Sequence, residues 1–308
     1  MRKKDPKIFP FVNKFTTERL FTYIDEIMNE KELKSEEEFN EFMESIRNAP
    51  LESLKKKVPD SPRLRAQELI YKAAESSTAK GKKLVLKALE IYPDCADAYN
   101  YLGDCSENPE EALEFYRKAI EAGERDLGEK CFKEDVGHFW GITRTRPYIR
   151  AKFSYAQMLA LLENIDEAIA VYQDILRLNP NDNMGSRFEL APLLLEKKYF
   201  KAYYDLYKAY EDDVSFGWLY NYVLYLYIKI GAVKKTQEIL RKAISYNPYV
   251  IDYMVGIKEM PDELPGQYLI GSEEEALLYV NSAIIAWMKY PRALYWIGDF
   301  WERHRNLD

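Results

Sequence analysis

Histidine and cysteine are scarce in this chain, and their scarcity limits the chemistry that it can perform. Among 308 residues there are 2 histidines, His138 and His304, and 3 cysteines, Cys95, Cys105 and Cys131. The cysteines lack the paired spacing of a disulfide framework or a zinc site, so we expect buried free thiols. With so few ligands available, we predict no metal site and no cofactor.

Long apolar runs and an excess of positive charge are also missing. The longest apolar run, 218–230, is interrupted by Asn221 and Lys229 and is shorter than the roughly 20 residues that span a bilayer. No sustained apolar stretch follows the first residues, so we expect no signal peptide, no membrane partner and a cytoplasmic protein. The net charge is −7, and the basic run 55–57 has no basic surroundings, which disfavours a nucleic-acid partner.

Catalytic motifs are absent as well. The sequence has no nucleophile in a strand-turn-helix elbow, no glycine-rich phosphate loop and no carboxylate pair in a recognisable motif. We therefore predict that the protein is not an enzyme and has no catalytic residues. Segment 123–150 leaves an alternative open, because His138 could serve as a general acid or base there, or the segment could contact RNA. The other interpretation is a structural insertion that packs Phe139 and Trp140.

What the chain does have is a repeat. Ala168, Ala202 and Thr236 are evenly spaced, since 202−168 = 34 and 236−202 = 34, and neighbouring positions follow the same offset. Each frame contains two apolar stripes at helical spacing with a polar break between them, which predicts a helical hairpin. Small residues at the tightest points would allow close helix packing. These residues are Ala168, Ala202, Ala209 and Ala243.

The repeat resembles the tetratricopeptide repeat, whose 34-residue unit has small, aromatic and proline residues at fixed positions. Frame 149–182 fits best, with Ala156, Ala168, Tyr172 and Pro180 in place. The resemblance implies an all-α fold, a right-handed α-solenoid of helical hairpins. We predict an N-terminal helical arm, a repeat array of about five hairpins with an insertion, and a C-terminal helical cap. Their ranges are 1–60, 61–250 with the insertion at 123–148, and 251–308.

A narrower resemblance comes from three short segments. Residues 93–99, 137–141 and 145–148 are similar to those of bacterial and plant repeat proteins described as like suppressor of tumorigenicity 7. This resemblance implies no activity for any residue.

Helix signals also mark the two ends of the chain. Residues 15–28 and 36–46 read as amphipathic helices, the second with Ser35 as an N-cap and Glu38 three residues later. Near the other end, Ser272 is followed by three glutamates, which favours a helix start there, and Pro291 can open a last helix.

In the tetratricopeptide family the first helix of each hairpin lines a concave groove, so the resemblance implies a set of groove residues. Asn100 and the arginines could hold a peptide, since an amide pairs with the backbone and a guanidinium holds a carboxylate. Arg146 and Arg150 are four apart on one helix face and repel each other unless an anion or carboxylate lies between them, which makes them candidates for an anionic partner. The predicted partner-binding residues are Asp97, Asn100, Asp104, Arg146, Arg150, Phe153, Gln157, Arg187, Trp218, Asn221 and Tyr225.

These observations predict a protein-interaction scaffold that binds a protein or peptide segment in the groove. An alternative is a sensor in which a bound peptide shifts the N-terminal helices and so controls a partner.

Overall fold

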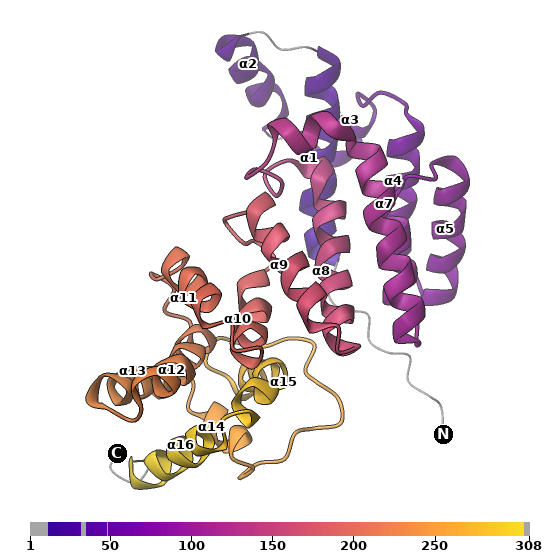
Figure 1. Ribbon diagram of the computed structural model, residues 1–308. Coiled ribbons are helices and arrows are strands. Elements are labelled where there is room, and N and C mark those ends of the chain that lie inside the picture. Colours follow the sequence, from indigo (N-terminus) through magenta and orange to yellow (C-terminus); the bar gives the residue numbers. More distant parts are fainter. Residues whose placement is uncertain (1–11, 32–34, 48, 305–308) are drawn as a thin grey trace. The chain divides into compact units, whose positions relative to one another are not determined.

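The computed structural model describes residues 12–31, 35–47 and 49–304 (Figure 1). Over these residues the chain forms α-helices and one short 3₁₀ helix and contains no strand, which confirms the all-α prediction. The chain divides into two compact units, Met1–Met184 and Gly185–Asp308. This boundary falls inside the range predicted as one array, and the three-part division remains a prediction.

Unit 1 consists of an arm of three helices followed by stacked helical hairpins. The hairpins pair α4 with α5, α6 with α7 and α8 with α9, and the first helix of each packs beside the next, α4 on α6 and α6 on α8. The elements are α1 (Val12–Lys31), α2 (Glu36–Ile46), α3 (Leu51–Lys55), α4 (Pro62–Ala74), α5 (Thr78–Ile91), α6 (Ala96–Asp104), α7 (Pro109–Glu134), η1 (Thr143–Thr145), α8 (Arg146–Leu161) and α9 (Ile165–Leu178).

Local capping explains where several of these helices begin. The hydroxyl of Ser35 accepts a hydrogen bond from the backbone N–H of Glu38 at 3.1 Å, so the predicted cap of α2 is confirmed. Ser61 caps α4 in the same way, and Pro62 takes the first helical position, where its missing N–H costs nothing.

The predicted insertion is partly a continuation of a hairpin. Helix α7 extends to Glu134, although Gly128 interrupts it with φ of 70° and ψ of 164°, a conformation that favours glycine. Beyond α7, Phe139 is fully buried, with its ring 5.4 Å from Phe132 and 6.2 Å from Tyr148 between centroids. The prediction that Phe139 packs against the hairpins is confirmed.

Unit 2 contains two hairpins and three further helices. Helix α15 packs against α10 and α12, the first helices of the two hairpins, and α16 packs against α12, α14 and α15. The Ser272 hydroxyl accepts a hydrogen bond from the N–H of Glu275 at 3.3 Å, which confirms the predicted helix start. The helices are α10 (Ser186–Glu196), α11 (Phe200–Ala209), α12 (Phe216–Ile230), α13 (Lys234–Tyr246), α14 (Tyr249–Met254), α15 (Glu273–Met288) and α16 (Pro291–His304).

The small residues of the repeat do not all occupy tight packing positions. Ala168 and Ala243 are fully buried as predicted, but Ala209 is exposed. Here the prediction was wrong because aromatic rings fill the space between α11 and α12. Tyr207 and Tyr222 stack with their centroids 3.8 Å apart, a spacing that holds the two helices away from each other.

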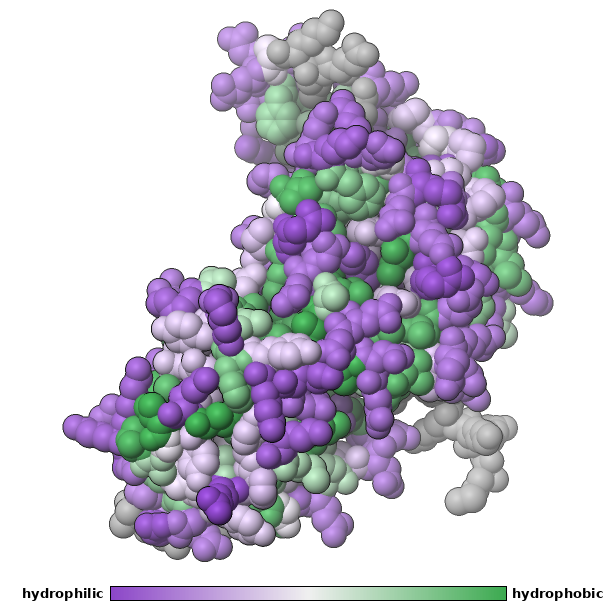
Figure 2. Space-filling view, viewed as in Figure 1, coloured by the Kyte–Doolittle hydropathy of each residue, from purple (hydrophilic) through white to green (hydrophobic). Residues whose placement is uncertain are grey.

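The surface and the thiols fit a packed helical protein. In Figure 2, the apolar residues on the visible face form small groups separated by hydrophilic ones.

The three cysteines are free, and burial raises the pKa of Cys95 to about 12. Within the described ranges, no helix combines the length and apolar continuity needed to cross a membrane, and no cluster of three or more metal-binding side chains occurs.

Candidate functional site

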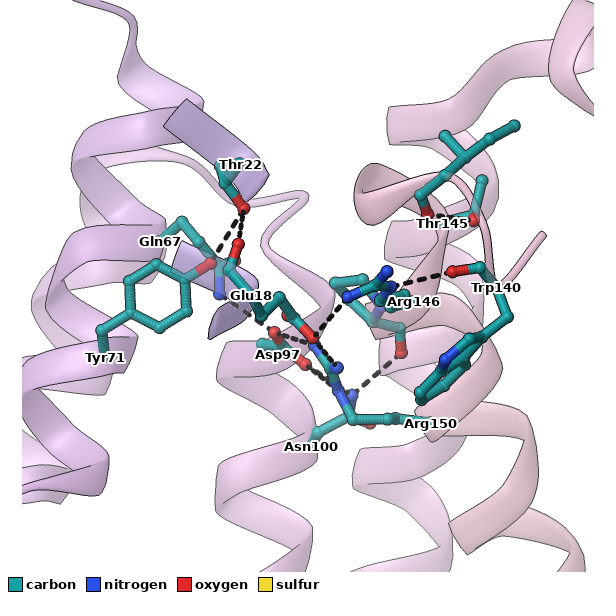
Figure 3. A network of polar contacts seen from close by, with 12 residues as sticks. Glu18, Thr22, Gln67, Tyr71, Asp97, Asn100, Trp140, Thr145, Arg146 and Arg150 are labelled. Carbon is teal, nitrogen blue, oxygen red and sulfur yellow. Dashed lines mark hydrogen bonds and ion pairs between the residues drawn. The ribbon is translucent and has the colours of Figure 1, made fainter. Parts of the chain in front are cut away.

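Helix α1 lies on the face formed by the first helices of the three hairpins in unit 1. This is the face that the family resemblance predicts as the groove. Polar side chains of α1 meet polar side chains of α4 and α8 there, and Asp97 of α6 joins them through Arg150 (Figure 3). We call this surface the α1 seat, and it comprises Gln67, Glu68 and Tyr71 of α4, Asp97 and Asn100 of α6, and Arg146 and Arg150 of α8.

Arg150 is at the centre of the seat. Its Nη1 and Nη2 atoms donate to the two carboxylate oxygens of Glu18 at 2.8 and 2.9 Å, a two-pronged contact with the neighbouring helix. Its Nε and Nη2 atoms also donate to Asp97 at 3.2 and 2.7 Å. The side chain is 14% exposed, so the ion pairs are buried rather than on the surface. Bidentate arginine contacts of this kind are strong and directional.

Arg146 adds a second positive charge beside the first. Its Nη1 atom lies 3.9 Å from Oε2 of Glu18, and its Nε atom donates to the backbone carbonyl of Trp140 at 2.9 Å. Figure 3 shows the Glu18 carboxylate between the two guanidinium groups. The sequence indicated that Arg146 and Arg150 repel each other unless an anion or carboxylate lies between them, and the structure places the Glu18 carboxylate there. The carboxylate comes from the same chain.

Asp97 and Asn100 hold the middle of the seat together. Gln67 donates to Asp97 at 3.0 Å, and the Asn100 amide donates to Asp97 at 3.2 Å and to the carbonyl of Pro147 at 3.1 Å. Both side chains are more than nine-tenths buried. The Oδ1 atom of Asn100 is buried and accepts no hydrogen bond from the described residues. The seat therefore retains one unused acceptor.

A second group of contacts fixes the next turns of α1. Arg19 donates to both carboxylate oxygens of Glu68, which also accepts a hydrogen bond from the Tyr23 hydroxyl. The Thr22 hydroxyl lies 3.1 Å from the Tyr71 hydroxyl. Glu18 and Thr22 are four residues apart, as are Arg19 and Tyr23, so these contacts lie along one side of α1.

The last turn of the same face is held by another charge network. Arg63 of α4 donates to Glu26 of α1 at 2.7 Å and to Asp126 of α7 at 3.3 Å. Arg144 and Tyr92 also donate to Asp126. Helix α1 is thus tied to the hairpins along its length mainly by charged side chains.

The seat shifts the protonation equilibria of its members. Burial lowers the pKa of Arg150, but the carboxylates of Asp97 and Glu18 outweigh it and raise the pKa above its usual value. Burial raises the pKa of Glu68, but hydrogen bonds from Arg19 and Tyr23 outweigh that effect and lower it. Burial raises the pKa of Tyr71. Arg150 and Glu68 are therefore charged at neutral pH, and Tyr71 is neutral.

The other predicted groove residues of unit 1 do not join this cluster. Asp104 keeps exposed surface and accepts a hydrogen bond from the Tyr116 hydroxyl at 2.8 Å, while desolvation by the surrounding chain raises its pKa to about 6. Phe153 packs edge-on against Tyr172, with centroids 5.7 Å apart. Gln157 is exposed.

In unit 2 the predicted groove residues are covered by the chain itself. Trp218 is fully buried, and Asn221 is 1% exposed and accepts a hydrogen bond from the Tyr279 hydroxyl of α15 at 3.0 Å. Arg187 pairs with Asp213 at 2.8 Å. Tyr225 stacks against Tyr204, Tyr222 and the buried Tyr203.

Several of the predicted groove residues are therefore less accessible to solvent than the sequence predicted. The sequence predicted a free surface, but Asp97, Asn100, Arg146 and Arg150 lie under α1, and Trp218 and Asn221 are buried in unit 2. The physical reason is that the terminal helices bury their polar or apolar faces against the first helices of the hairpins. As partner-binding residues, all eleven remain a prediction.

The residues that the sequence interpretation missed lie on α1 and α4. Glu18, Thr22 and Glu26 recur every four residues, as do Gln67 and Tyr71, and these spacings mark polar faces of two helices. The signal was present in the sequence. The spacing does not reveal that the polar face of α1 packs on the polar face of α4, because the repeat register does not extend to the arm.

The segment that carried the enzyme alternative leaves its histidine on the surface. His138 is exposed, and its backbone carbonyl accepts hydrogen bonds from the N–H groups of Gly141 and Ile142. Trp140 instead lies beneath the guanidinium of Arg146, 5.4 Å from the ring centroid. This segment therefore supports the α1 seat through Trp140.

Comparisons with known proteins agree with part of this picture. Residues 144–183, which hold η1, α8 and α9, match the family model for the tetratricopeptide repeat. The match is to one hairpin. It is the hairpin of the frame that fits the repeat best and the one that supplies both arginines of the seat.

One solved structure is also similar. It is the crystal structure of YrrB, described as a TPR protein with an unusual peptide-binding site. The TM-score is 0.42 and the sequence identity 23%, over 58% of this chain and 81% of that chain. No curated protein sequence matches the chain. The resemblance to proteins like suppressor of tumorigenicity 7 stays a prediction.

Proposed function

We propose that the protein is a scaffold for protein–protein interaction and that the α1 seat is the surface on which a helical segment of a partner binds. One observation carries this proposal. The first-helix face of unit 1 already holds a helix, and holds it by the bidentate contact of Arg150 with Glu18. A surface with these donors fits a helix that carries carboxylates.

The proposal is tested with a partner taken from the source cell. The intact chain is used to recover proteins that adhere, and each recovered protein is then purified and titrated against variants. Arg146→Gln keeps a donor for the Trp140 carbonyl but removes the charge near Glu18. The comparison is made within the Glu18→Gln chain, which serves as the unchanged chain here, because α1 otherwise uses the same charge and would be loosened together with the partner. There we expect Arg146→Gln to weaken partner binding, because one of two positive charges is lost from the seat.

The matched control is Arg117→Gln, which makes the same change at an exposed arginine of α7 that pairs with two glutamates of its own helix. This variant should bind the partner as the unchanged chain does. Equal affinity for the Arg146 and Arg117 variants would argue that a partner binds elsewhere. Recovery of no partner by the intact chain would argue against the scaffold itself.

A regulatory sensor is a second candidate, and one observation favours it. The arm helices α1, α2 and α3 share an apolar cluster of their own, formed by Tyr23, Ile27, Phe42, Ile46 and Leu54 with Leu64 of α4. The arm is therefore a small packed body, and displacement of α1 would move that body. This candidate requires that a partner displace α1 from the seat.

A further inference from the structure

We infer that the partner segment is an acidic amphipathic helix and that α1 is the chain's own stand-in for it. This inference rests on the proposed function and specifies it. A partner helix would bind by replacing α1, with a glutamate at the place of Glu18. Without a partner, α1 covers the seat and the chain is in a closed state. The seat becomes accessible only when a partner helix replaces α1.

The charge of the seat determines the chemistry of its occupant. Arg146 and Arg150 both face the position of one carboxylate oxygen, Oε2 of Glu18, at 3.9 and 2.8 Å. Asp97 balances only part of this positive charge, and it also accepts hydrogen bonds from Gln67 and Asn100. An occupant without a carboxylate would leave two like charges side by side in a poorly solvated place. The occupant is therefore acidic at this point.

The spacing of the contacts determines the shape of the occupant. On α1 the contacts come from Glu18, Thr22 and Glu26, with Arg19 and Tyr23 beside them. These positions fall on one face of a helix of about two and a half turns. The hairpins receive these contacts on two separate helices, α4 and α8, so an extended peptide would not match the same partners. The partner segment is a helix with a polar face.

The chemistry of the contact explains why α1 can leave. Its face toward the seat consists mainly of charged and hydroxyl groups, and water replaces such contacts when the helices separate. Its buried apolar side chains, Tyr23 and Ile27, belong to a cluster formed mainly by the arm itself, with Leu64 of α4. The hairpin core formed by Ile70, Val85 and Ala98 is a separate cluster. Displacing the arm therefore leaves the hairpin core intact.

Covalent connection gives α1 an advantage over any helix from another molecule. Its effective concentration at the seat is on the order of millimolar, as for other segments tethered close to their site. A partner helix with the same contacts therefore binds the unchanged chain weakly. Weakening α1 should raise the apparent affinity by the factor by which the open state, with α1 off the seat, gains population.

The test uses a labelled synthetic peptide with the sequence of residues 12–31 as the probe, titrated onto full-length chains. In the Glu18→Gln chain, α1 loses its bidentate contact, while Glu30→Gln makes the same change on the exposed side of α1. Hydrogen bonds to charged groups contribute enough for about a tenfold change in an equilibrium constant. We expect the peptide to bind the Glu18→Gln chain at least about tenfold more tightly than the Glu30→Gln chain.

A second peptide tests the required carboxylate. The same sequence with Glu18→Gln should bind the Glu18→Gln chain about tenfold more weakly than the original peptide. Circular dichroism of each chain shows that the helices are retained. Equal binding of the two peptides, or equal binding to the two chains, overturns the inference. Absence of binding to every chain also overturns it, because α1 would not be exchangeable.

Two further outcomes would assign the seat to a different occupant or the partner to a different role. A wild-type chain that dimerises in sedimentation, and becomes monomeric when Glu18 is replaced, would assign the occupant to a second copy and overturn the partner-helix assignment. If the peptides fail but a partner from the source cell still distinguishes Arg146→Gln from Arg117→Gln, the inference fails and the scaffold stands. If no partner is recovered, the proposed function fails whatever the peptides do.

Discussion

Two terminal segments of this protein meet the hairpins in the same way but by different chemistry. In unit 1, α1 contacts the first helices α4 and α8, and in unit 2, α15 lies on the first helices α10 and α12. Helix α1 is held through Glu18, Arg19 and Glu26. Helix α15 is held through buried Ala283, Trp287 and their neighbours.

The difference determines which helix is permanent. Charged groups regain water when they separate, so an ion-paired contact contributes little net free energy compared with an apolar one of similar area. Tyr279 and Trp287 have no such alternative, because their rings would be exposed. The Tyr279 ring also lies 3.1 Å from where a Cβ on Gly217 would be, so α15 approaches α12 closely. Helix α15 is therefore part of the core of unit 2, and α1 is the cover that we propose to be exchangeable.

The largest loss of stability should come from removing an apolar side chain of α15. Trp287→Ala removes a fully buried indole whose N–H donates to the Tyr279 hydroxyl at 3.2 Å. Truncation of a buried tryptophan costs about 3–5 kcal/mol, and we expect unit 2 to lose that much stability in chemical denaturation. Met288→Ala, at the neighbouring exposed position, should change little. A small effect of Trp287→Ala would mean that α15 is a cover like α1.

The next effect should come from the centre of the α1 seat. Arg150→Met leaves the carboxylates of Glu18 and Asp97 buried without their counter-charge, which costs about 3 kcal/mol in comparable buried pairs. We expect denaturation of unit 1 to begin at lower denaturant. Adding Glu18→Gln to Arg150→Met should restore part of the loss, since one unpaired charge is removed. If the double variant is less stable than Arg150→Met alone, the two substitutions act independently, and Arg150 and Glu18 do not stabilise each other as an ion pair.

Acid should weaken the charged contacts of α1 and leave the uncharged contacts of α15 with α12 unchanged. Hydrogen bonds from Arg19 and Tyr23 hold the pKa of Glu68 below its usual value of 4.5. An acid with a depressed pKa stabilises the fold above its unfolded pKa and loses that contribution as pH falls through the folded value. Stability of unit 1 should therefore decline below about pH 4.5.

Glu68→Gln provides the matched comparison for this pH dependence. It removes charge-assisted hydrogen bonds worth about 1.5 kcal/mol at neutral pH, and it should flatten the acid limb of the stability curve. Unfolding by denaturant at a series of pH values measures both effects. An acid limb of unchanged slope in Glu68→Gln would show that another carboxylate causes it.

The sequence predicted the hairpins well because their packing requires particular residues at fixed positions. Ala168 and Ala243 must be small and are buried, and Tyr172 and Leu240 fill the space beside them. Capping is also local, so Ser35 and Ser272 could be identified from a few neighbours. Such features depend on residues close in sequence and leave a periodic pattern.

The site was harder to predict because it depends on residues far apart in the chain. Arg150 and Glu18 are 132 positions apart, and nothing in the repeat register indicates that an arm without the repeat lies on the first helices. The sequence did predict that Arg146 and Arg150 need a carboxylate between them. It could not say that the chain supplies this carboxylate, since a charged face is equally compatible with solvent, a partner or another helix.

The smallest loss of stability should come from removing the helix caps of the two terminal segments. Ser272→Ala and Ser35→Ala each remove a hydroxyl that accepts one backbone N–H, and each should cost about 1 kcal/mol locally. Because α15 is part of the core of unit 2, the Ser272 loss should appear in its global unfolding. Helix α2 belongs to the arm, so the Ser35 loss should appear only as faster hydrogen exchange in residues 35–46. Equal loss of global stability in both variants would show that the arm unfolds with the hairpins, and α1 could not then exchange while they remain folded.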